Sequence, residues 1–109
     1  MFVHEDHRRK IIEWATGDFK VAKALIAKPG CIVGDHHHLN KDETFLLLVG
    51  KASYVVIGER EWHNAAPLTL WEVPRGAYHR FELDEGSILL GVGSESFDAT
   101  DEIKGHPIG

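Results

Sequence analysis

Short apolar runs separated by turn residues dominate the chain, and they predict β-strands. The runs are rich in β-branched or aromatic residues, and each one ends at glycine, proline or a charged cluster. They cover residues 19–27, 31–33, 44–49, 52–57, 68–73, 77–82 and 87–92. Short strands at regular spacing are typical of an all-β sandwich or barrel. We therefore predict a single all-β domain over residues 1–109.

The two ends of the chain are less regular than the middle. Residues 9–15 fit a short helical turn and a strand about equally well. We expect residues 1–18 to form an N-terminal arm or strand. The polar residues 95–109 are expected to form a loosely ordered tail.

Three consecutive histidines precede the central apolar run. On a strand, residues i and i+2 point to the same face, so His36 and His38 present two imidazoles together and His37 points to the other side. A turn in the polar stretch 39–42 can bring the carboxylate of Glu43 back toward these rings. The pattern therefore gathers candidate metal ligands on one face.

Two turn signals suggest hairpins that extend this face. Gly50-Lys51 fits a two-residue hairpin turn, and residues 83–86 fit a four-residue turn. The first hairpin would pair Val49 with Ala52, Leu47 with Tyr54 and Phe45 with Val56, and the second would pair Phe81 with Ile88 and His79 with Leu90. In this arrangement His79 shares the inward face with Glu43, together with Tyr54, Ile88, Leu90 and Val92.

The inward polar residues have the chemistry of a metal site. Three imidazoles and one carboxylate, unpaired in an apolar interior, would be costly unless a cation accepted their lone pairs. Three nitrogens and one oxygen suit Zn, Fe(II), Mn, Ni or Cu, and contain too much nitrogen for Ca or Mg. We therefore predict one divalent transition-metal ion, held by His36, His38, Glu43 and His79.

Two stretches of the chain resemble the two motifs of the cupin superfamily. The first motif is matched by Gly30, His36, His38, Glu43 and Gly50, and the second by Pro74, Gly76 and His79. The chain departs from the second motif at Leu68, where a glycine is usual, and at Leu83, where an asparagine is usual. Neither position is a metal ligand in the superfamily, so the predicted site is unaffected.

The resemblance implies a fold and a quaternary state. It predicts a double-stranded β-helix, or jelly-roll, cupin barrel of the RmlC-like kind, with the metal inside its wider end. It also predicts a homodimer. Metal-independent sugar epimerases and ketoisomerases of this fold usually carry Arg-Gly before their histidines, whereas this chain has Gly34-Asp35 there and also has Glu43. This difference favours metal chemistry.

Cupins include enzymes and binding proteins, so the fold leaves three functional hypotheses. The first is a metal-dependent isomerase or epimerase acting on a small polar ligand such as a sugar or sugar nucleotide, because the stretch from His36 to Gly50 resembles cupins of polysaccharide biosynthesis. Tyr54 and Tyr78 are its candidate proton carriers. The second is an Fe(II)-dependent dioxygenase, and the third is a non-catalytic binding or sensing protein.

Composition and charge narrow the classes of partner that the chain is expected to bind. The formal net charge of −5 and the scattered basic residues argue against binding to nucleic acid or to a membrane surface. A lone cysteine, Cys31, cannot form an intrachain disulfide, and no apolar signal segment opens the sequence. We therefore expect a reducing, cytoplasmic setting.

The remaining histidines and the large aromatics are assigned no chemistry. The histidines that match no ligand position, and are expected to be solvated, are His4, His7, His63 and His106. The aromatics expected to pack in the core or in an interface are Phe2, Trp14, Phe19, Trp62, Trp71 and Phe97. His4 and His7 are also candidates to line a partner subunit's pocket.

Overall fold

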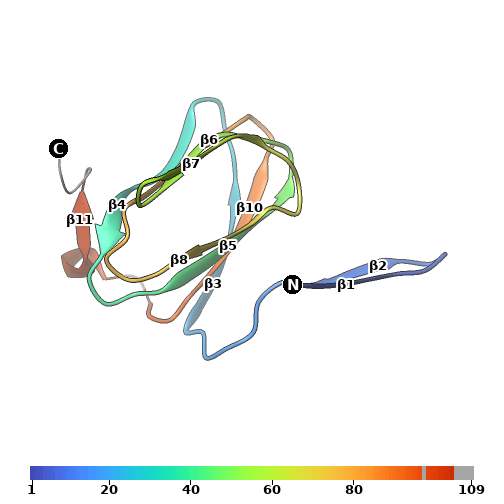
Figure 1. Cartoon of the computed structure of the whole chain (residues 1–109), viewed down its shortest axis with the longest axis horizontal. Helices are drawn as coiled ribbons and strands as arrows, with labels where there is room; N and C mark the ends of the chain where they lie inside the picture. The colour runs from blue at the N-terminus through green and yellow to red at the C-terminus, as the bar shows by residue number, and fades with distance from the viewer. Residues whose placement is uncertain (97, 105–109) are drawn as a thin grey trace.

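The computed structural model describes residues 1–96 and 98–104, and it forms two facing antiparallel sheets with a separate two-stranded arm (Figure 1). Phe97 and His106, with the rest of residues 105–109, lie outside the described residues. The strands are β1 Phe2–Glu5, β2 Lys10–Glu13, β3 Val21–Ile26, β4 Cys31–His38, β5 Glu43–Val49, β6 Ala52–Ile57, β7 Arg60–Ala65, β8 Leu70–Val73, β9 His79–Leu83, β10 Ile88–Gly93 and β11 Glu102–Lys104. A 3₁₀ turn, η1 Ala99–Asp101, precedes β11.

The strand order is that of a jelly roll: from β3 on, successive strands alternate between the two sheets, except that β6 and β7 pair within one sheet. One sheet has the order β3-β10-β5-β8 and the other has the order β11-β4-β9-β6-β7. The prediction of an all-β jelly-roll barrel is therefore confirmed. The sequence specifies it through strand alternation: in β9 the burial of successive residues alternates between buried and intermediate from His79 to Leu83.

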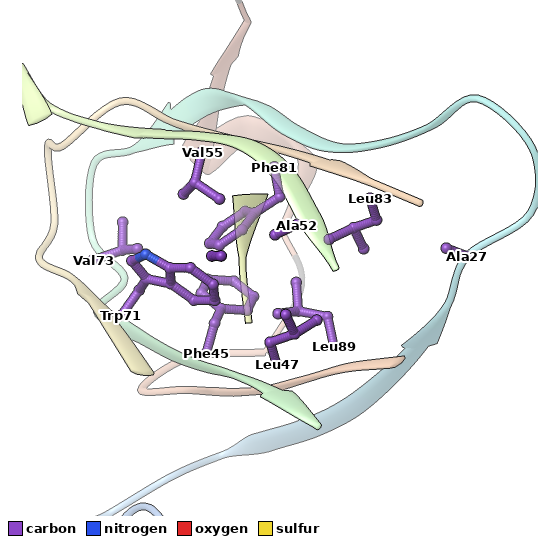
Figure 2. Close-up of a cluster of buried hydrophobic side chains, with 11 residues drawn as sticks. Ala27, Phe45, Leu47, Ala52, Val55, Trp71, Val73, Phe81, Leu83 and Leu89 are labelled. Carbon is purple, nitrogen blue, oxygen red and sulfur yellow. The ribbon is translucent and has the colours of Figure 1, made fainter. Parts of the chain in front are cut away.

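The core lies between the two sheets and is built from the inward residues of both (Figure 2). Phe45 and Phe81, from opposite sheets, are fully buried with ring centroids 4.9 Å apart. The Trp71 indole packs edge-on against Phe81 at 5.2 Å. This aromatic block fills the barrel interior beside the predicted metal site, because the ring of His79 lies 5.9 Å from that of Phe45.

Both predicted hairpins are wrong. Strand β5 pairs with β10 and β8, and β6 pairs with β7 and β9. Gly50-Lys51 instead carries the chain from one sheet to the other, where the Lys51 amide donates to Ser87 Oγ at 3.0 Å. The alternation of apolar residues is the same for a hairpin and for a corner between sheets, since both aim inward residues at one core.

Some inward positions differ as a result. In β10 the register shifts between Ile88 and Leu89, so that Leu89 is the fully buried core residue while Ile88 and Leu90 are only partly buried. Val49, at the end of β5, is 45% exposed. Strand β7 was not predicted, because most of its side chains are exposed and it carries no apolar run.

The ends of the chain form defined strands. Residues 9–15, for which helix and strand were both open, contain β2, which pairs with β1 in a hairpin that projects away from the barrel (Figure 1). The predicted loose tail differs from the structure over 102–104, where β11 pairs with β4. Of the aromatics, Trp71 is buried, whereas Phe2 is 58% exposed on the arm. No helix able to cross a bilayer occurs in the described part of the chain.

Candidate metal centre

A bulge in β4 brings the first two histidines to the site. The register between β4 and β9 shifts after Gly34, so that Asp35 is the extra residue and His36 pairs with His79. Gly34 and Asp35 both have positive φ, of 85° and 65°. A Cβ on Gly34 would lie 2.7 Å from the carbonyl oxygen of His79, so glycine is required by both the conformation and the close approach of the two strands.

The structure brings the four predicted ligands together. One donor atom from each of the four residues lies within 4.8 Å of every other. The members of this group, which we call the histidine–glutamate cluster, are His36, His38, Glu43 and His79. Their strands come from both sheets, so the cluster lies between the sheets in the barrel interior. His37 is not a member of this group of described residues.

The carboxylate of Glu43 faces two imidazoles. Its Oε1 lies 3.0 Å from His38 Nε2 and 3.5 Å from His79 Nε2, and all three side chains are at most 4% exposed. Oε1 has no hydrogen-bond partner among the described residues despite being buried. A buried carboxylate oxygen without a donor, beside imidazole nitrogens, fits a shared cation.

The electrostatics keep the imidazoles of His36 and His79 neutral. Burial, followed by the neighbouring imidazoles of His36 and His38, lowers the pKa of His79 from 6.5 to about 3. Burial is also the main reason that the pKa of His36 is lowered. Neutral imidazole is the form that binds a metal, so at neutral pH His36 and His79 present lone pairs for coordination. The residues therefore fit the divalent ion that the sequence predicts.

Lys23 on β3 also reaches the cluster, and sequence reasoning missed it. Its Nζ donates to Glu43 Oε2 at 3.4 Å and lies 5.7 Å above the Phe45 ring. The stem has room because β10 carries Gly91 between β3 and β5, where a Cβ would meet Phe45 at 2.9 Å. Strand alternation could have identified this residue, because Lys23 lies two residues before the inward Leu25 on the same strand.

The two tyrosines proposed as proton carriers are not brought to the cluster. On β9 the inward residues are His79 and Phe81, so Arg80 points to the outer face, where it lines a 310 Å³ pocket with Tyr54 and Tyr78. Tyr54 Oη donates to Glu61 at 2.9 Å. Both hydroxyls therefore lie on the outer side of the five-stranded sheet.

The hydroxyl of Tyr78 instead secures the bulge. It donates to Asp35 Oδ1 at 2.5 Å, and the Arg80 guanidinium lies 3.6 Å from the same oxygen. This hydrogen bond is the main reason that the pKa of Asp35 is lowered, while burial and the same bond raise the pKa of Tyr78. Tyr78 and Arg80 thus hold Asp35 in its left-handed conformation from outside the barrel, directly before His36.

Comparisons with known proteins give a fold relationship. No family model matches the chain. An uncharacterised protein of Aquifex aeolicus (strain VF5) is 31% identical over 70 residues, which are 63% of this chain and 56% of that protein. The chain therefore spans little more than half of this curated relative.

Solved structures share the architecture at low identity. The capsular polysaccharide assembling protein CapF from Staphylococcus aureus superposes with a TM-score of 0.67 and 24% identity, over 96% of this chain and 34% of CapF. QdtA, a sugar 3,4-ketoisomerase from Thermoanaerobacterium thermosaccharolyticum in complex with TDP, superposes with a TM-score of 0.73 and 21% identity, over 98% of this chain and 85% of QdtA. This chain thus matches one third of CapF and most of QdtA.

Proposed function

We propose that this chain, which has the cupin fold of these neighbours, binds one divalent transition-metal ion through its histidine–glutamate cluster. The observation that carries the proposal is the buried Oε1 of Glu43, which has no hydrogen-bond partner in the described part of the chain and faces the Nε2 atoms of His38 and His79. Three nitrogens and one oxygen make Zn, Fe, Mn, Ni or Cu the candidate ions.

Metal content tests this proposal directly. We expect the purified protein to retain about one equivalent of a transition metal by elemental analysis, as a single site of this kind requires. Replacing His36 and His38 together by alanine should abolish uptake. His63→Ala is the matched control, because this histidine is 66% exposed on β7, at the edge of the five-stranded sheet. Retention of a full equivalent by the double variant would refute the site.

We further propose that the protein is an isomerase acting on a nucleotide-linked keto sugar. The support is twofold: a fold neighbour with most of its length matched is a sugar 3,4-ketoisomerase in complex with TDP, and the cluster lies in the barrel interior. When bound, the metal ion would supply a Lewis acid that polarises a carbonyl group.

The chemistry requires proton carriers but no oxidant. When a ketone moves to the neighbouring carbon, the hydroxyl-bearing carbon loses its proton and the former carbonyl carbon gains one. The hydroxyl oxygen also gives up its proton and becomes the carbonyl oxygen, while the former carbonyl oxygen takes up a proton and becomes the hydroxyl, so protons and electrons balance within the substrate. Lys23 is suited to hold and deliver a proton here, because its side chain is 40% exposed and its Nζ reaches Glu43 inside the barrel.

Turnover is tested with the metal-loaded protein and a panel of nucleotide-linked 4-keto sugars in D₂O. We expect deuterium to enter the sugar beside the carbonyl, with the ketone shifting position by NMR. Silence across the panel, with no thermal shift, would contradict the proposal. Oxygen consumption by the iron-loaded protein would instead identify a dioxygenase. A thermal shift without turnover would identify a binding protein.

We also propose that a second copy of the chain covers the N-terminal arm. An isolated two-stranded hairpin is at best marginally stable in water, yet β1 and β2 pair only with each other among the described strands. The arm exposes apolar side chains, with Phe2 58% and Val3 42% exposed. We expect light scattering to give a dimer for the full chain and a monomer after deletion of residues 1–18. An unchanged mass would refute this role of the arm.

A further inference from the structure

The last described segment of the chain lies against the strand that carries two of the ligands. Strand β11 pairs with β4, with Glu102 opposite His38 and Lys104 opposite His36. The 3₁₀ turn before it ends at Asp101, which is 7% exposed. Two consecutive carboxylates, from Asp101 and Glu102, thus come to the back of the histidine–glutamate cluster.

The two carboxylate oxygens of Asp101 make different contacts. Its Oδ1 accepts from the backbone amides of Leu39, at 3.1 Å, and Asn40, at 2.7 Å. Its Oδ2 lies 3.4 Å from Nδ1 of His38, and both side chains are at most 8% exposed. The hydrogen bonds from these two amides hold the turn that follows β4, and Oδ2 faces the imidazole of His38.

The orientation of His38 makes this second contact meaningful. Its Nε2 faces Glu43 at 3.0 Å and its Nδ1 faces Asp101 on the opposite side of the ring. His38 Nδ1 is buried and has no hydrogen bond among the described residues, so the Asp101 carboxylate 3.4 Å away is placed to favour a proton on this nitrogen. The Nε2 lone pair is then directed into the cluster. An outer carboxylate of this kind selects the tautomer and raises the basicity of a ligating imidazole.

His36 has a similar, more distant neighbour. Its Nδ1 lies 3.9 Å from Glu102 Oε1, with both side chains about one eighth exposed. Glu102 also accepts from Lys104 Nζ at 3.2 Å, which shares its charge with a cation outside the barrel. Asp101 is therefore the stronger of the two partners.

We propose that Asp101, supported by Glu102, is a positioning residue that fixes the tautomer and orientation of the ligating histidines, so that the C-terminal segment completes the metal centre. This inference rests on the proposed metal-binding function. It assigns a role to a segment that the metal-site motifs do not include, and it makes metal affinity depend on residues beyond the barrel strands.

Asp101→Asn separates the two tasks of this side chain. The amide oxygen can still accept from Leu39 and Asn40, but an NH₂ group replaces the oxygen that faces His38. That NH₂ favours the tautomer with the proton on Nε2, which blocks coordination. We expect the metal dissociation constant, measured by chelator competition, to rise about 10- to 100-fold. Asp98→Asn changes an exposed side chain beside the same turn, which among the described residues is hydrogen-bonded to Thr100, and should leave it unchanged.

A second measurement excludes a merely structural role. In the metal-free protein, ¹⁵N NMR of the histidines should show His38 with its proton on Nδ1 in the wild type and on Nε2 in Asp101→Asn. The melting temperature in EDTA should fall no more for this variant than for Asp98→Asn. Equal metal affinities of wild type and Asp101→Asn, or an Nε2–H tautomer already present in the wild type, would overturn the proposal.

The two proposals fail in different ways. A wild-type protein that takes up no metal would refute the proposed function. The tautomer of His38 in the metal-free protein would still decide whether Asp101 positions the ring. A wild type that binds metal, together with an unaffected Asp101→Asn variant, would refute only the inference.

Discussion

Substitution of Gly34 by alanine tests whether the bulge in β4 sets the geometry of the histidine–glutamate cluster. Gly34 has a φ of 85°, and a Cβ there would lie 2.7 Å from the His79 carbonyl oxygen, 2.8 Å from Cδ2 and 3.2 Å from Nε2 of the same residue. Contacts below 3 Å to backbone and to a buried ring cannot be relieved by a side chain turning away. The added methyl must therefore push β4 and β9 apart.

The expected cost has two parts. A left-handed conformation costs an L-residue about 1–2 kcal/mol, and an extra methyl in a tightly packed site costs about 1–3 kcal/mol. Gly34→Ala should therefore lower the free energy of unfolding by about 2–5 kcal/mol, a large share of the stability of a small domain. Because the methyl displaces His79, metal affinity should fall as well.

Gly86→Ala is the matched control. Gly86 has nearly the same φ, 84°, but a Cβ there would meet no atom of the described residues within 4 Å. It should therefore cost only the conformational part, about 1–2 kcal/mol. Urea unfolding in EDTA measures both free energies, and chelator competition measures both affinities. If the two variants lose equal stability and keep equal metal affinity, the close approach of Gly34 to His79 plays no part in the site.

Further predictions concern charge and packing. The pKa of His79 is about 3 in the folded protein and 6.5 in the unfolded chain, so at intermediate pH His79 takes up a proton on unfolding. As the pH is lowered from 6.5, the free energy of unfolding of the metal-free protein should therefore decrease by up to about 1.4 kcal/mol per pH unit. Urea midpoints that do not change with pH would contradict this. Lys23→Met should tighten metal binding, because it removes a cation 3.4 Å from Glu43. The same variant should lower any isomerase turnover by about 10²-fold or more. Unchanged turnover would rule out the proposed role of Lys23 as a proton carrier. Phe81→Ala should lower the urea-unfolding free energy by about 3–5 kcal/mol, since this ring is fully buried against Phe45 and Trp71; a loss below 1 kcal/mol would show that the core collapses around the gap.

The local sequence pattern predicted which face of a strand a residue occupies better than it predicted which strands pair. The alternation of a strand is decided by the backbone itself, so the common face of His36 and His38 follows from their spacing alone. Pairing depends on which strands the whole chain brings together. The turn at Gly50-Lys51 has the residues of a hairpin, yet it joins two sheets.

The sequence by itself therefore determined the all-β architecture, the inward face of the central strands and the four residues of the histidine–glutamate cluster. Tertiary structure alone decided what surrounds them. Lys23 approaches Glu43 only because Gly91 leaves room on the strand between them. Asp101 reaches the turn after β4 across 62 residues of chain. Such contacts depend on how distant strands close the barrel, and no local periodicity encodes that closure.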